Sequence, residues 1–187
     1  MTLAALALCA IPFPCAAQSD WVTYGHDPGQ TKYSPLAQID TSNVGQLQQA
    51  WVYHMRPAAE GGKTRRLVSS PATPLVIDGI MYLATPYNSV IALKPETGEL
   101  LWTYNLEQSR FLGRSATWWP GDKITPASLF FGTADGRLLS LNAKTGKPTV
   151  QFGEKGFLKL KTGMTDPPNI DGRYSMTSAA SIYKNLI

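Results

Sequence analysis

Few side chains in this sequence have the types and spacing that catalysis or metal binding requires. The 187 residues include only two histidines, His26 and His54. Neither has a metal-ligand partner at a useful spacing, so the interpretation for both is a structural or surface role.

The cysteines and the overall charge exclude several classes of function. Both cysteines, Cys9 and Cys15, lie in the apolar N-terminal stretch, so the rest of the chain has no disulfide, thiolate metal site or haem-attachment motif. The formal net charge is +4, but the basic residues are scattered apart from the short run at 63–66. A nucleic-acid surface needs a basic stripe, so no nucleic-acid partner is predicted.

The chain is organised around residues 75–104. Apolar runs at 76–84 and 90–93 are followed by the turn Lys94-Pro95-Glu96-Thr97-Gly98 and a third run that is closed by Trp102. Short apolar runs between turn residues predict antiparallel strands. Gly98 suits a turn position with positive φ.

This unit recurs along the sequence. Residues 139–147 repeat residues 91–99, so that Gly146 stands 48 positions after Gly98. The segment Ala50-Trp51-Val52-Tyr53 also resembles Leu101-Trp102-Thr103-Tyr104, which indicates a third copy of the repeat. Repeats of about 40–50 residues built from strands and turns indicate the blades of a β-propeller. Asp135-Gly136 predicts a hairpin, residues 157–174 are predicted to form a long loop, and residues 175–187 restart the pattern. The predicted fold is all-β, with about three blades.

Two regions are expected along the chain. Residues 1–17 are apolar and end in small residues, which predicts a signal peptide and a periplasmic protein. This stretch is too short and too rich in proline to span a bilayer. Residues 18–187 are predicted to be an incomplete propeller, because a closed ring needs about four to eight blades. We therefore expect a fragment of a longer protein, truncated at its C-terminal end. A small complete domain is the alternative, but its unpaired strand edges would be prone to aggregation.

Together these residues resemble the N-terminal part of a pyrroloquinoline quinone (PQQ)-dependent dehydrogenase, a family with an eight-bladed propeller. The similarity covers about residues 20–187. It rests on sequence blocks that include Tyr33-Ser34-Pro35-Leu36, Ala92-Leu93 with Thr97-Gly98 and Trp102, and Arg114 followed by Trp119-Pro120-Gly121-Asp122.

The resemblance implies a cofactor site. PQQ would lie at the propeller axis beside Ca²⁺, with Arg114 at the position of the family's quinone-contacting arginine and Thr177 at that of a threonine that hydrogen-bonds the cofactor. Aligning residues 74–79 with 180–185 makes Thr177 equivalent to Pro71, so both should face the axis. A guanidinium can bind a carboxylate through two parallel hydrogen bonds. The alternatives are a surface or structural arginine in a loop for Arg114 and a structural threonine in a β-turn for Thr177. The catalytic aspartate and the Ca²⁺ ligands are expected beyond residue 187, so this chain is predicted to be inactive alone.

Two positions depart from the family pattern. Pro71 stands where the family carries a glutamate, and Gln108-Ser109 stands where the alcohol-oxidising branch has a vicinal cysteine pair. The second departure favours a glucose-dehydrogenase-like branch.

The predicted function is oxidation of an alcohol, sugar or polyol, with electrons passing to a membrane quinone or a cytochrome. Membrane association of the periplasmic protein is left open. The alternative is a non-catalytic propeller that acts as a binding or assembly scaffold, and the block from Arg114 to Asp122 favours the enzyme.

Overall fold

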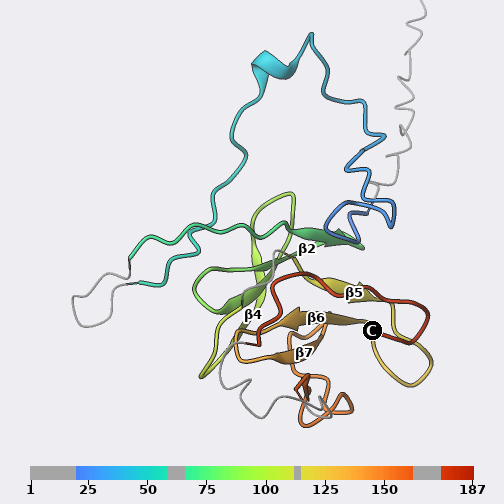
Figure 1. The fold of residues 1–187 in the computed structure, drawn as a ribbon. Helices are drawn as coiled ribbons and strands as arrows, with labels where there is room; N and C mark the ends of the chain where they lie inside the picture. The colour runs from blue at the N-terminus through green and yellow to red at the C-terminus, as the bar shows by residue number, and fades with distance from the viewer. Residues whose placement is uncertain (1–19, 59–65, 112–114, 162–173) are drawn as a thin grey trace, which may run out of the picture.

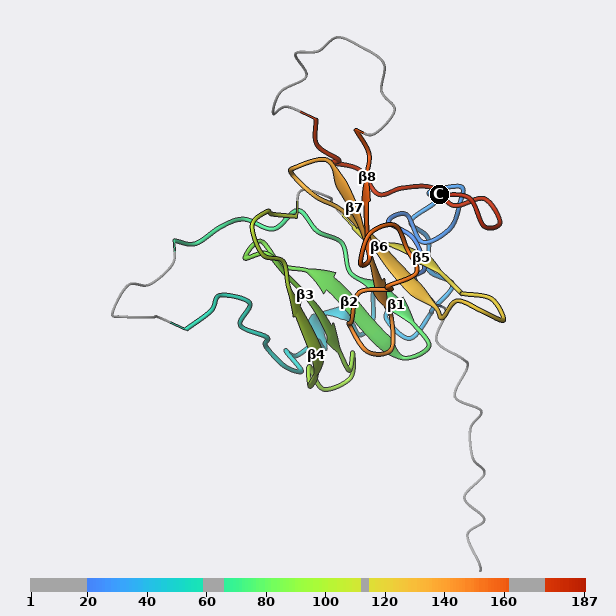
Figure 2. The same cartoon turned by 90° about the horizontal axis from the view of Figure 1, so that it is seen from below.

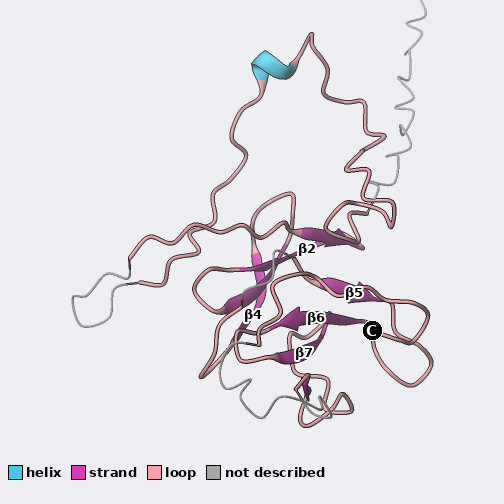
Figure 3. Cartoon of the chain, in the orientation of Figure 1, coloured by secondary structure: helices cyan, strands magenta, loops and turns pink. Residues whose placement is uncertain are grey.

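The fold was described from a computed structural model, which places residues 20–58, 66–111, 115–161 and 174–187. The predicted signal peptide and Arg114 lie outside these ranges. The described residues form two four-stranded antiparallel sheets, with strand orders β1-β2-β3-β4 and β5-β6-β7-β8. We call them sheet 1 and sheet 2. Figure 1 shows the two sheets one above the other, and Figure 3 shows that strands and loops make up nearly all of the described chain.

Sheet 1 consists of β1 (Leu75–Ile77), β2 (Ile80–Ala84), β3 (Ser89–Leu93) and β4 (Leu100–Asn105). The prediction of one continuous run over 76–84 was wrong, because Asp78 and Gly79 turn the chain between β1 and β2. Their φ angles are 50° and 71°, as a two-residue hairpin turn requires at both central positions. The turn after β3 was predicted correctly, and Gly98 has a φ of 72° there.

Sheet 2 consists of β5 (Thr117–Trp119), β6 (Ser128–Gly132), β7 (Arg137–Asn142) and β8 (Phe157–Lys159). The predicted hairpin at Asp135-Gly136 is confirmed, since it joins β6 to β7. The predicted loop over 157–174 was wrong at its start, because Phe157 pairs with Leu139 in β7. A strand of three residues carries too little local pattern to be recognised, and its pairing partner determines it.

The core lies between the two sheets. Strand register places Tyr82, Ala92 and Trp102 side by side on one face of sheet 1, and they share a hydrophobic cluster with Leu129 and Leu141 of sheet 2. Because side chains alternate along a strand, the neighbouring residues of sheet 2 point the other way. We call this other side the distal face of sheet 2 and define it by Trp119, Ser128, Phe130 and Ser140. Figure 2 shows the same two sheets from below.

A tryptophan links each repeat to the next. The indole Nε1 of Trp102 in sheet 1 donates to the carbonyl oxygen of Ala143 in sheet 2 at 3.0 Å. Trp51 makes the matching bond to the carbonyl oxygen of Pro95 at 2.9 Å. The third copy of the repeat, predicted at Trp51, therefore makes the same contact between repeats as Trp102 does. The residues around Trp51 nevertheless form no strand.

Residues 20–58 run outside the sheets. Trp21 pairs with Val76 of β1 through two backbone hydrogen bonds of 2.7 and 3.1 Å, and one 3₁₀ turn, η1, spans Val44–Gln46. Asn43 precedes this turn, and its side-chain oxygen accepts a hydrogen bond from the Asp40 backbone N–H at 2.9 Å. Figure 1 shows η1 well away from both sheets. Among the described residues, no helix has the length and apolar character needed to cross a bilayer.

Candidate functional site

A hollow in the structure lies beside β5. It has a volume of about 920 Å³ and is lined by segments 22–24, 116–118 and 177–182, with Pro71 at its edge. These segments come from three distant parts of the sequence. A concave site that is assembled from several segments is where a small molecule or cofactor is expected to bind.

The structure brings Thr177 and Pro71 to the same hollow. The sequence alignment of the repeats made these two positions equivalent, and their common location agrees with that alignment. Thr177 is exposed, so its hydroxyl is accessible to a ligand. Pro71 offers neither a side-chain acceptor nor a backbone N–H. The carboxylate of the glutamate that the family carries at this position is therefore missing from this wall.

Hydrogen bonds tie the walls together. The Thr117 hydroxyl donates to the carbonyl oxygen of Ala180 at 2.7 Å. The Ser115 hydroxyl donates to the carbonyl oxygen of Thr73 at 3.1 Å. Thus the start of β5 is fixed both to the segment before β1 and to the segment that carries Thr177. The contacts between these segments determine the shape of the hollow.

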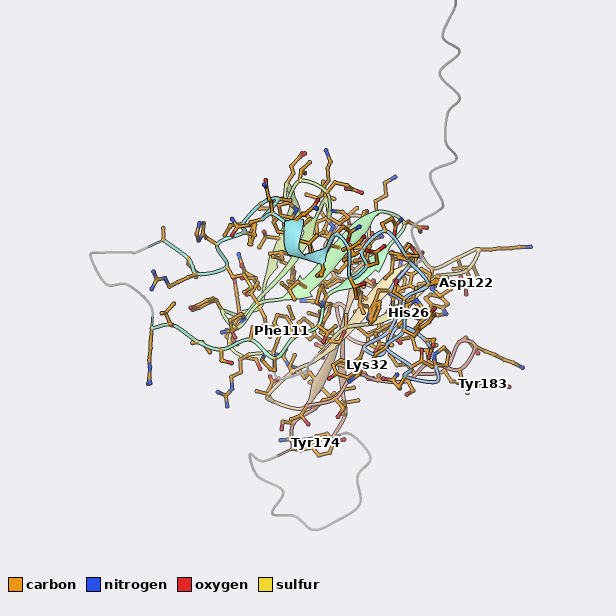
Figure 4. The ribbon with its side chains drawn as sticks, turned by 90° about the horizontal axis from the view of Figure 1, so that it is seen from above. His26, Lys32, Phe111, Asp122, Tyr174 and Tyr183 are labelled. Atoms are coloured by element: carbon orange, nitrogen blue, oxygen red, sulfur yellow. The ribbon has the colours of Figure 1, made fainter. Side chains whose placement is uncertain are left out.

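The N-terminal wall is a small loop with its own network. The Thr23 hydroxyl donates to the carbonyl oxygen of Asp27 at 3.2 Å, and the Thr31 hydroxyl and backbone N–H both donate to the Asp27 carboxylate. The hydrogen bond from the Thr31 side chain is the main reason that the pKa of Asp27 lies below its usual value. Trp21 and His26 pack with ring centroids 4.8 Å apart. Figure 4 labels His26 and Lys32 in this part of the molecule.

The lining residues suit a flat polar ligand in part. Tyr24 and Trp118 supply aromatic faces, and Thr177 and Ser178 supply hydroxyls. The sequence alone assigned no role to Tyr24 or Trp118. The only signal that could have indicated one is that both lie near the sequence blocks that resemble the PQQ-dependent dehydrogenases. Among the residues that the structure describes, none that lines the hollow is charged, so the described walls provide no counter-charge for carboxylates. Arg114, two positions before Ala116, is the cation nearest in sequence to β5 and lies outside the described residues.

The described ranges contain no group of three or more His, Cys, Asp or Glu side chains that could hold a metal ion. The predicted metal ligands were placed beyond residue 187, so this finding does not test that prediction.

The Trp119-Pro120-Gly121-Asp122 block ends β5 at Trp119 and begins the connection to β6. Gly121 has a φ of 83°, and Asp122 Oδ1 accepts from the backbone N–H groups of Ile124 and Thr125 at 2.8 and 2.7 Å. These hydrogen bonds lower the pKa of Asp122. Gly121 and Asp122 therefore have a structural role here, and these two residues alone do not distinguish an enzyme from a scaffold.

Gln108-Ser109, the position of the expected cysteine pair, is fixed by polar contacts. The Ser109 hydroxyl donates to Asp135 Oδ1 at 2.9 Å. Asp135 also accepts from the Thr133 hydroxyl and from Arg137 Nε at 2.5 and 2.7 Å. Through Asp135, the segment that leads toward Arg114 is attached to the β6–β7 hairpin.

The fold and the hollow define a class: propeller-type sheets that are linked by docked tryptophans, with a hollow of cofactor size beside β5, the first strand of sheet 2. Comparison with known proteins agrees. Residues 21–187 match the PQQ family described as glucose/ethanol/alcohol dehydrogenase, β-propeller domain. The chain belongs to this family.

Individual relatives are alcohol-oxidising proteins. An alcohol dehydrogenase (quinone), dehydrogenase subunit, from Gluconobacter oxydans is 38% identical over 137 residues, which is 68% of this chain and 16% of that protein. A 1-butanol dehydrogenase (cytochrome c) from Thauera butanivorans is 37% identical over 135 residues, 71% of this chain and 18% of that protein. The chain thus spans less than a fifth of the length of these two relatives.

A solved structure is also similar. The quinohemoprotein alcohol dehydrogenase from Comamonas testosteroni superposes with a TM-score of 0.66 at 30% identity, covering 89% of this chain and 22% of that one. This confirms the predicted propeller architecture. The expectation of a glucose-dehydrogenase-like branch receives no support from these alcohol dehydrogenases and stays a prediction.

Proposed function

We propose that this chain is the N-terminal part of a periplasmic quinoprotein oxidoreductase that oxidises an alcohol, sugar or polyol with PQQ as the hydride acceptor. The observation that supports this most directly is the hollow beside β5. It collects Thr177, Pro71 and Trp118 from separate repeats, in a chain whose relatives are named as quinone-linked and cytochrome-linked dehydrogenases.

Each wall of the hollow would have a distinct role toward the cofactor. The Thr177 hydroxyl would donate a hydrogen bond to a carboxylate or carbonyl oxygen, and the rings of Trp118 and Tyr24 would pack against a planar ring system. Arg114 would supply the positive charge that the described walls lack. When bound, PQQ supplies an ortho-quinone that accepts a hydride, and Ca²⁺ would act as a Lewis acid.

The catalytic base and the Ca²⁺ ligands would come from residues that follow Ile187. On this proposal, the chain alone is inactive. Electrons would leave the complete protein for a membrane quinone or a cytochrome, and the protein would act in the periplasm, with or without membrane association.

A second candidate is a non-catalytic propeller that serves as a binding or assembly scaffold. Two observations favour it. Pro71 occupies the position where a carboxylate was expected, and the described lining of the hollow carries no charge. A scaffold would need neither a counter-charge nor a cofactor.

Titration with PQQ and Ca²⁺, followed by cofactor absorbance and thermal melting, separates the two candidates. The enzyme proposal expects saturable binding that is weakened at least tenfold by Thr177→Val or by Arg114→Ala. The controls Thr103→Val, on an exposed β4 position, and Lys123→Ala, in the exposed β5–β6 connection, should bind as the parent chain does. A cooperative melt with no PQQ binding, both in this chain and in the product of the complete reading frame, would favour the scaffold.

A further inference from the structure

We propose that the β6–β7 hairpin (residues 133–136) fixes the two segments that carry Arg114 and Thr177, and that Asp135 in this hairpin is a positioning residue for the cofactor. Asp135 would act through Ser109, on the segment that leads to Arg114, without touching PQQ itself. This inference rests on the proposed function, because that function assigns Arg114 and Thr177 to the cofactor.

The hairpin lies at the end of sheet 2 where β5 begins. Thr117, the first residue of β5, pairs with Phe130, close to where β6 ends and the hairpin begins. Thr117 also lines the hollow, whereas Asp122 follows the other end of β5. Figure 4 labels Phe111 and Asp122 on opposite sides of the sheets. The hairpin is therefore close to the start of the strand that borders the proposed cofactor site.

Hydrogen bonds and a backbone bridge attach the segment after β4 to this hairpin. The Ser109 hydroxyl donates to Asp135 Oδ1 at 2.9 Å. The backbone N–H of Ala134 donates to the carbonyl oxygen of Arg110, also at 2.9 Å. Phe111 forms an isolated antiparallel bridge with the first residue of the hairpin. The course of the chain just before Arg114 therefore depends on where the hairpin lies.

The segment that carries Thr177 contacts the same hairpin. The Met176 backbone N–H donates to the carbonyl oxygen of Thr133 at 3.4 Å. Met176 also packs closely on Gly132, where an added Cβ would lie 2.5 Å from the Met176 Cβ. One hairpin thus contacts both segments to which cofactor ligands are assigned, although these segments are far apart in the sequence.

The repeat shows that a residue at this hairpin position can hold a connecting segment. Tyr87 stands 48 positions before Asp135 and lies in the β2–β3 hairpin. Its hydroxyl donates to the carbonyl oxygen of Arg66 at 3.2 Å and accepts from the Val68 backbone N–H at 3.4 Å. That segment leads to Pro71 at the edge of the hollow. Both hairpins therefore use the same repeat position to fix a segment that leads to a proposed site position.

Asp135 is itself fixed inside the hairpin, so its carboxylate is a well-placed acceptor. The Thr133 hydroxyl and Arg137 Nε donate to it at 2.5 and 2.7 Å, and the Arg137 guanidinium lies 4.4 Å from the centre of the Phe157 ring. A hydrogen bond to a charged group is stronger than one between neutral groups. Removing the Ser109 hydroxyl would therefore release the segment but leave the contacts within the hairpin intact.

Titration with PQQ tests the inference, in the product of the complete reading frame with Ca²⁺ present. Ser109→Ala removes the hydrogen bond to Asp135, and Ser109→Thr retains the hydroxyl. Ser89→Ala is the matched control, because it removes a 2.9 Å bond to the Asn105 side chain in sheet 1. We expect Ser109→Ala to weaken PQQ binding at least fivefold, whereas Ser109→Thr and Ser89→Ala remain within twofold of the parent.

Double-mutant cycles show whether Ser109 acts through Arg114. In an Arg114→Ala background, Ser109→Ala should change the PQQ affinity less than twofold, since the contact that it positions is already absent. In a Thr177→Val background, Ser109→Ala should still weaken binding at least fivefold. Equal weakening in both backgrounds would overturn the inference, because Ser109 would then have only a general structural role.

Amide hydrogen exchange without PQQ gives a readout that does not depend on the cofactor. The Ala134 N–H should exchange at least fivefold faster in Ser109→Ala, because its bond to Arg110 joins the same two segments. The Thr85 N–H, which donates to the carbonyl oxygen of Ser89 at 2.7 Å in the β2–β3 hairpin, should exchange at the parent rate. An unchanged rate at Ala134 would overturn the role of Ser109.

Binding by the parent separates this inference from the proposed function. If the parent binds PQQ and Ser109→Ala binds it equally well, the inference is wrong and the proposed function stands. If the complete product binds no PQQ, the proposed function is wrong and the inference fails with it, whatever the exchange rate at Ala134.

Discussion

Trp102 donates its indole N–H to the carbonyl oxygen of Ala143 across the two sheets, at 3.0 Å. The ring also lies against Gly146, where an added Cβ would approach Cε3 to 2.5 Å. Trp51 repeats both contacts with Pro95 and Gly98. The spacing of glycine and tryptophan in the repeat therefore specifies how successive units pack.

Replacing Trp102 by Phe should separate the hydrogen bond from the packing. The phenyl ring retains most of the apolar contact, but the Ala143 carbonyl loses its donor. We expect the free energy of unfolding to fall by about 1 kcal/mol for the lost bond plus a smaller packing term. Trp102→Ala should cost about 3–5 kcal/mol. Urea denaturation measures both, and an unchanged midpoint for Trp102→Phe would mean that the bond adds nothing.

Gly146→Ala should be more destabilising than Gly79→Ala. The two glycines have nearly equal φ angles, 68° and 71°, so the backbone strain is similar. A Cβ at position 79 would meet nothing within 4 Å, whereas one at position 146 would meet the Trp102 ring. We expect an additional loss of about 1–3 kcal/mol at position 146. Equal losses of unfolding free energy for the two variants in urea denaturation would show that the Trp102 ring can shift away from the added Cβ without destabilising the fold.

Asp135→Asn should remove part of the acid sensitivity of folding. Burial disfavours the charged form of Asp135, but hydrogen bonds from Thr133 and Ser109 and the charge of Arg137 outweigh burial and lower its pKa below 3.8. A lowered folded-state pKa gives stability that is present above the unfolded value and is lost as the pH falls through the folded one. The variant should therefore lose stability at neutral pH and show a weaker decline below about pH 3.8.

Melting temperatures between pH 2 and 7 measure this effect. The parent chain, melted in the same buffers, is the reference. An Asp135→Asn profile parallel to that of the parent would show that the carboxylate does not contribute.

Tyr82→Phe should remove a tyrosine whose ionisation is delayed in the folded chain. Burial, and then the negative charge of Asp78, raises the pKa of Tyr82 to about 12. Because the folded state holds this proton more tightly, the associated stability is full below pH 10 and declines as the pH rises toward 12. Ultraviolet titration of the phenolate should lose its late component in the variant, and a late component of unchanged size would contradict the assignment to Tyr82.

Much of the fold could be predicted because the signals are local. The turn at Lys94–Gly98, the hairpin at Asp135-Gly136 and the repeat at Leu139–Lys147 each depend on residues that are close in sequence, and the structure confirms them. The hairpin at Asp78-Gly79 has the same kind of local signal, but it lies inside an apolar run that predicts one continuous strand.

The candidate site could be predicted only in part. The repeat alignment made Thr177 equivalent to Pro71, and they line one hollow. The contributions of Tyr24 and Trp118 could not be derived, because the distance between segments 22–24 and 116–118 depends on how the sheets and the N-terminal loop pack.

The sequence by itself determined the repeating unit: its strands, its positive-φ glycines and its docking tryptophans. These features follow from backbone sterics and hydrophobic pattern within one unit. Only the tertiary structure decided that β8 forms a strand, that Thr177 and Pro71 share a hollow, and that the buried Ser140 hydroxyl has no hydrogen-bond partner in the part of the chain that the structure describes. The physical reason is that each depends on contacts between units, and a side chain's burial and hydrogen bonding are properties of the packed array rather than of its neighbours in sequence.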